Sequence, residues 1–105
     1  MQHEKHRNED PLTGLIHLQL ANGSFKFGQA LEKLIGMSEE QLIEKKLKGE
    51  ENIAWITAVA FAVLEIKFQK DKELWDLIAR KAKQFIEKHT KTDFDKIIIN
   101  AKAII

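Results

Sequence analysis

"ENIAWITAVAFAVLEIKFQ", residues 51–69, is the stretch that decides the fold. Nearly every side chain of residues 53–64 is apolar, so a helix formed here is apolar around its whole circumference. A helix of that kind is buried among other helices. Small side chains recur every four residues, at Ala54, Ala58 and Ala62, and they let a neighbouring helix approach closely. The stretch therefore predicts a buried central helix over residues 51–69.

Composition limits the kinds of protein to which the chain can belong. Its 105 residues suit one domain, and 44% hydrophobic residues with a single proline favour a helical core. The 17 basic and 16 acidic residues nearly balance, which gives no indication of a nucleic-acid partner. Cysteine is absent, which excludes disulfides and thiol nucleophiles. The apolar run is shorter than the roughly 20 residues of a membrane span. We therefore expect a cytoplasmic protein without a membrane partner.

Short helices are predicted on the N-terminal side of the central stretch. Asp10 and Pro11 form a typical helix start, since Asp accepts hydrogen bonds from first-turn N–H groups and Pro is tolerated at the first position. This helix is expected to end near Ala21, before an Asn-Gly turn. The next helix covers residues 30–35 and ends at Gly36, a typical C-cap.

Three further helix starts follow along the chain. Ser38 to Gln41 matches the capping-box pattern and begins a third helix. Asp71 is placed to cap a fifth helix, and Thr92 or Asp93 to cap a last one. The inward stripe of the fifth helix is predicted to contain Leu74, Trp75, Leu77, Ile78, Ala82, Phe85 and Ile86.

Together these elements predict the fold class and the domain organisation. Residues 1–9 are wholly polar and are expected to form a flexible tail. Residues 10–105 are expected to form a single all-α domain. We predict a compact bundle of about five to six helices around the central helix, residues 51–69.

The sequence offers few candidates for chemistry. The acidic pairs at residues 39–40 and 50–51 lie beside helix starts, where they complement the helix dipole. Thr57, inside the buried helix, is expected to bond a carbonyl one turn back. Trp is enriched at binding hot spots, but Trp55 and Trp75 both lie on core stripes. We therefore predict no enzymatic activity, no catalytic residues, no cofactor and no metal site.

Three segments in series resemble a known family. They are "LIHLQLANGSFKFGQALEKLIGMSEEQL" (15–42), "IAWITAVAFAVLEIKF" (53–68) and "KELWDLIARKAKQFI" (72–86). In this order and spacing they resemble the C-terminal helical domain of vault poly(ADP-ribose) polymerase and the tails of proteins that join a VIT domain to a von Willebrand factor A domain. The positions that carry the resemblance, expected in the core or in turns, are Gln19, Gly23, Ser24, Phe25, Gly36, Trp55, Thr57, Ala58, Leu64, Glu65, Phe68, Trp75, Lys81 and Ala82.

The resemblance implies an all-helical interaction module without enzymatic activity. In vault poly(ADP-ribose) polymerase this region belongs to the part that binds major vault protein, so major vault protein is the implied partner. Two positions depart from the family pattern. Asn22 replaces the usual Asp, and Phe85 stands where Trp is common.

Other interpretations stay open. The domain could instead self-associate, with residues 97–105 as the candidate contact, or serve as an adaptor for a non-vault partner. Gln19, Gly23 and Phe25 also match loosely the Q-x-x-x-G-x-W/F repeat of terpene-cyclase-like barrels. One copy in 105 residues cannot close such a barrel. The sequence does not determine the oligomeric state.

Overall fold

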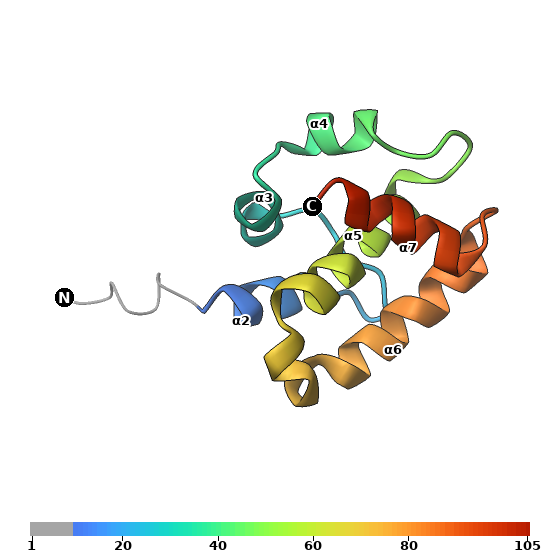
Figure 1. The fold of residues 1–105 in the computed structure, drawn as a ribbon. Coiled ribbons are helices and arrows are strands. Elements are labelled where there is room, and N and C mark those ends of the chain that lie inside the picture. Colours follow the sequence, from blue (N-terminus) through green and yellow to red (C-terminus); the bar gives the residue numbers. More distant parts are fainter. Residues whose placement is uncertain (1–9) are drawn as a thin grey trace.

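The computed structural model describes residues 10–105, and the predicted flexible tail at residues 1–9 lies outside the described residues. Within the described part the structure contains helices and no strand, and one isolated antiparallel bridge pairs Gln19 with Phe25. The all-α prediction is therefore confirmed. In chain order (Figure 1) the helices are α2 (Pro11–Ile16), α3 (Gln29–Ile35), α4 (Glu39–Glu44), α5 (Asn52–Lys67), the 3-10 turn η1 (Gln69–Asp71), α6 (Lys72–His89) and α7 (Phe94–Ala103).

Helix α5 is the centre of the bundle, as its composition predicts. Every side chain of residues 54–64 is buried. Helices α6 and α7 make the most extensive contacts with it, and α3 and α4 pack against it as well. Figure 1 shows α5 enclosed between α6 and α7, with α3 and α4 on a further side. A helix that is apolar all round thus has neighbours around it.

The central helix is shorter than predicted. It ends at Lys67 rather than at residue 69, because Phe68 leaves the helical region with φ −126° and ψ 32°. The indole Nε1 of Trp75 donates to the Phe68 carbonyl over 2.7 Å and so satisfies a group at the helix end. The chain then turns through η1 into α6.

The predicted caps of the shorter helices are largely confirmed. The Asp10 carboxylate accepts from the Thr13 N–H at 3.2 Å, and Ser38 with Gln41 forms a complete capping box. Gly36 ends α3 in the left-handed conformation, with φ 71°. By contrast, Asp71 and Asp93 stand at the starts of α6 (Lys72–His89) and α7 (Phe94–Ala103) but make no side-chain capping bond.

The first helix ends five residues earlier than Ala21, at Ile16. Beyond it, backbone hydrogen bonds join Lys26 N–H to the Leu18 carbonyl and Leu20 N–H to the Ser24 carbonyl. The chain therefore doubles back on itself over these residues and cannot continue as a helix. We call residues 18–26 the returning loop.

Helix α7 is docked on the core, as predicted for the last segment. Its residues Ile97, Ile98 and Ala101 are buried. Across the described part of the chain, no single helix is both long and apolar enough to cross a membrane, although α5 and the segment 69–89, bent by 93°, pass that test as a pair by length and composition alone.

Candidate functional site

The returning loop is held against α6 by Gln19 and Gly23. Gln19 Nε2 donates to the Ile78 carbonyl at 2.9 Å and to the Gly23 carbonyl at 3.1 Å. Gly23 has φ 94°, and a β-carbon built on it would lie 2.4 Å from the Lys81 carbonyl oxygen. No other residue fits this close approach without a shift of the backbone. The loop and α6 therefore meet backbone to backbone.

The other side of the loop is held against α5 by Thr57. The Phe25 N–H donates to Thr57 Oγ1 at 2.9 Å, and Thr57 Oγ1 donates to the Ile53 carbonyl at 2.7 Å. The predicted bond from Thr57 to a carbonyl one turn back is thus confirmed. Phe25 and Thr57 are fully buried, and Ser24 Oγ donates to the Asn22 side chain. One hydroxyl satisfies a buried donor and links the loop to the central helix.

Both tryptophans lie in the core and have hydrogen-bonded indoles. Trp55 Nε1 donates to the Leu42 carbonyl at 2.9 Å and joins α5 to α4. Trp75 is 3% exposed, and its indole holds the end of α5, as described above. Neither ring is presented to solvent as an interface anchor.

The remaining positions of the family pattern are scattered over the fold. Ala58, Leu64 and Ala82 are fully buried. Gly36 is an exposed helix end, and Phe68 is half-buried at the end of α5. Lys81 contributes its carbonyl to the contact with Gly23, while its side chain is exposed. The structure thus brings together the loop positions with Thr57 and Lys81, and it places the others elsewhere.

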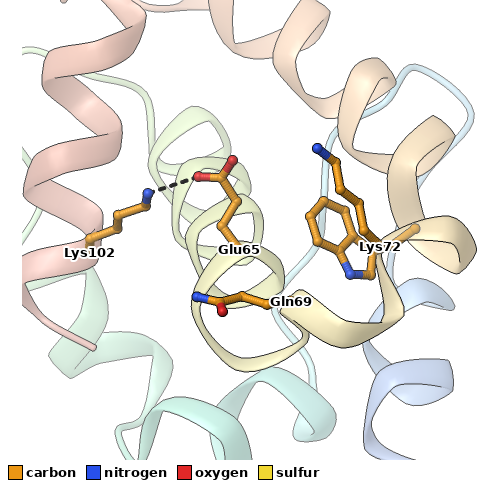
Figure 2. A pocket seen from close by; sticks show the side chains of 5 residues that line it. Glu65, Gln69, Lys72 and Lys102 are labelled. Atoms are coloured by element: carbon orange, nitrogen blue, oxygen red, sulfur yellow. Dashed lines mark ion pairs between the residues drawn. The ribbon is translucent and has the colours of Figure 1, made fainter.

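Glu65 belongs to a surface pocket of about 300 Å³. Figure 2 shows its carboxylate paired with Lys102 on one side of the pocket and Lys72 on the other side, and Trp75 also lines the pocket. The Glu65–Lys102 ion pair, at 2.9 Å, joins α5 to α7, and both side chains are more than one third exposed. An exposed pair of this kind contributes little stability. Residues 10–105 hold no group of three or more acidic or histidine side chains that could bind a metal ion.

Glu50 is a structural residue whose role sequence reasoning missed. It is 4% exposed, and its carboxylate accepts from the Thr92 N–H at 2.8 Å, from the Lys91 N–H at 3.0 Å and from the Thr92 hydroxyl. Burial raises the pKa of this carboxyl, but the hydrogen bonds from Thr92 and Lys91 favour the ionised form more strongly, so its pKa lies below its usual value. The prediction that the pair at 50–51 serves only the helix dipole is therefore incomplete, because Glu50 holds the α6–α7 connection.

The predicted inward stripe of α6 is wrong at two positions. Leu74 is 68% exposed and Leu77 is 71% exposed. The buried face is formed instead by residues spaced three and four apart, at Trp75, Ala79, Ala82, Phe85 and Ile86. Because α6 lies on the surface of the bundle, only one side of it meets α5, and a seven-residue stripe is wider than that contact.

The two exposed leucines begin a solvent-facing row along α6. Helical spacing places Leu74, Leu77, Lys81, Gln84 and Lys88 on one side of the helix, and all five are exposed. We call these five residues the α6 stripe. Exposed leucines are ordinary when they occur singly, whereas here two of them, each about 70% exposed, lie one helical turn apart.

No protein-family model matches the chain, and no solved structure matches it. The chain is similar to von Willebrand factor A domain-containing protein 5A of human, 30% identical over 98 residues, and of mouse, 28% identical over 98 residues. In both cases the match covers 92% of this chain and 12% of the relative. The rat protein is 33% identical over 82 residues, 77% of this chain and 10% of its own length. This similarity agrees with the expected relation to von Willebrand factor A domain proteins.

Proposed function

We propose that this domain is a non-enzymatic docking module for a cytoplasmic protein partner. The observation that carries the proposal is the exposed leucine pair of the α6 stripe, Leu74 and Leu77. Keeping these two side chains in water forgoes the roughly 1.5–3 kcal/mol that burial of each would contribute. A partner that covers them gains that contribution on binding.

The similarity to one short part of a much longer protein supports the same proposal. The chain spans 12% of the length of its human and mouse relatives. The match is thus to one domain-sized part of a longer chain, which is compatible with a docking module. The family resemblance, which spans about residues 12–87, makes major vault protein the candidate partner.

Self-association along the last helix has less support. Ile97 and Ile98, in the proposed contact segment, are 0% and 6% exposed and pack in the core. Of the isoleucines in α7, Ile99 alone has a large exposed fraction, 67%. Serine at Ile98 would therefore disturb the fold before it tested an interface.

The test is a calorimetric titration of the domain with purified major vault protein. The proposal predicts saturable heat that persists at moderate salt, because the leucine contact is apolar and is not screened. Apolar contacts can form with almost no heat near room temperature, but the heat of binding then changes with temperature, so the titration is run at two temperatures. Absence of heat at both, with the domain at about 100 μM, would remove major vault protein as the partner.

A further inference from the structure

The α6 stripe has two chemically distinct halves. Its N-terminal half is apolar, with Leu74 and Leu77 one helical turn apart. Its C-terminal half is basic, with Lys81 and Lys88 two turns apart and Gln84 between them. The spacing of 3, 4, 3 and 4 residues along the row is the spacing of a coiled-coil seam. The row therefore presents its exposed side chains along one side of α6, and the returning loop packs against the backbone of Lys81 at its middle.

The acidic side chains of α6 are not placed to neutralise the two lysines in the C-terminal half of the α6 stripe. The Asp76 carboxylate is paired with Arg80 at 2.8 Å. Helical spacing puts Glu73 at the apolar end of the stripe and turns Glu87 away from Lys88. The charge that faces a partner at the C-terminal end is consequently positive, and acidic side chains complement it.

The size of the row limits the occupant. Two exposed leucines supply far less area than the roughly 800 Å² that each partner contributes to a stable globular interface. A second copy in parallel register would also bring lysines against lysines, and an antiparallel copy with leucine on leucine would bury only the two leucine pairs. A single amphipathic helix needs only one such row.

We propose that the α6 stripe binds an amphipathic acidic helix of the partner protein. Two apolar side chains of that helix, one turn apart, cover Leu74 and Leu77. Glu or Asp side chains one and three turns further along lie against Lys81 and Lys88. This inference rests on the proposed docking function and specifies the chemistry of the partner.

The first test uses labelled synthetic helices of roughly 16 residues, long enough to be helical. Each carries a Leu-x-x-Leu pair and two Glu residues at the matching spacing. One peptide has this order for a helix parallel to α6, and a second has the reverse order for an antiparallel helix. Fluorescence anisotropy with the intact domain should show saturable binding for one direction. A peptide with Lys in place of both Glu should bind about tenfold or more weakly, since two attractions become two repulsions.

A charge-exchange variant separates this site from general stickiness. The double variant Lys81→Glu with Lys88→Glu should bind the acidic peptide about tenfold or more weakly than wild type. It should bind the Lys peptide more tightly by a similar factor. Lys83→Glu with Lys96→Glu, at exposed positions off the stripe, is the matched control and should change neither affinity by more than about twofold. Circular dichroism of each variant confirms that the helices are intact.

Three results would overturn the inference. The first is no anisotropy change up to about 1 mM of either acidic peptide. The second is leucine-dependent dimerisation of the free domain in sedimentation equilibrium without peptide binding. The third is binding to vesicles of phosphatidylcholine and phosphatidylserine without peptide binding, because a basic amphipathic face can also meet an anionic membrane.

The two proposals can fail separately. If major vault protein binds with unchanged affinity to the charge-exchange variant, docking stands and the α6 stripe is not the site. If the acidic peptide binds and major vault protein does not, the surface is correct and the partner is a different protein.

Discussion

Gly23 and Lys81 meet so closely that a β-carbon at position 23 would lie 2.4 Å from the Lys81 carbonyl oxygen. This contact seats the returning loop on α6. The Gln19 side chain donates a hydrogen bond to the Ile78 carbonyl, one turn earlier in the same helix. On the opposite side of the loop, the Phe25 N–H donates to the Thr57 hydroxyl of α5. The family-pattern residues Gln19, Gly23 and Phe25 therefore have a structural role, because they hold the returning loop against α5 and α6.

Gly23→Ala should destabilise the domain more than the same change at Gly49. Both glycines have a positive φ of similar size, 94° and 89°, so alanine strains each of them by about 1–2 kcal/mol. At Gly49 a β-carbon meets nothing within 4 Å, whereas at Gly23 it collides with the backbone of α6. We expect a further loss of about 1–3 kcal/mol at Gly23, measured by urea unfolding. Equal losses for the two variants would show that the close contact with α6 is unimportant.

Thr57→Val should leave the buried Phe25 N–H without an acceptor. Valine has the shape of threonine but no hydroxyl, so the expected loss is about 1–3 kcal/mol of unfolding free energy. Thr57→Ser keeps the hydroxyl and loses one methyl, at about 1 kcal/mol. A larger loss of unfolding free energy for Thr57→Ser than for Thr57→Val would contradict the role given to this hydrogen bond.

Glu50→Gln should destabilise the domain near neutral pH and matter less in acid. The pKa of Glu50 is lower in the folded state than its usual 4.5, so its stabilisation is fully present above that usual value. The stabilisation is lost as the pH falls below 4.5 and through the folded pKa. We expect a difference of about 1–3 kcal/mol between wild type and variant at pH 7, shrinking towards pH 3.

The control for this pH dependence is Glu44→Gln, which removes the same charge from an exposed position on α4. Its unfolding free energy should follow that of the wild type across the same pH range. If the difference in unfolding free energy between wild type and Glu50→Gln stayed constant with pH, ionisation of Glu50 would not stabilise the α6–α7 connection.

Trp55→Ala should cost about 3–5 kcal/mol, because it empties the largest fully buried site of the core. Trp55→Phe fills most of that volume but removes the donor to the Leu42 carbonyl. We expect it to lower the unfolding free energy by about 1–3 kcal/mol. A loss below about 1 kcal/mol for Trp55→Ala in urea unfolding would contradict the central position of α5.

The features that could be predicted from the sequence are those fixed by local chemistry. The apolar run of residues 53–64 can be stable only as a buried helix, and the Ser38–Gln41 box and Gly36 act within one turn of their own helices. The bond from Thr57 to Ile53 is local in the same way.

The features that could not be predicted depend on contacts between distant segments. Glu50 meets Lys91 and Thr92, about 40 residues further on, and its neighbour Glu51 is exposed although both have the same local signals. The exposure of Leu74 and Leu77 depends on how much of α6 faces α5, which periodicity does not give. The candidate docking surface was therefore visible only in the structure.

The most direct test of the docking account is a titration of major vault protein with two double variants of the domain. Leu74→Ala with Leu77→Ala removes the apolar half of the α6 stripe and keeps helix propensity. Ile66→Ala with Ile99→Ala removes exposed apolar side chains from α5 and α7 instead. The account predicts that the leucine variant binds at least tenfold more weakly than wild type, while the isoleucine variant is unchanged. Equal binding of all three proteins would contradict it.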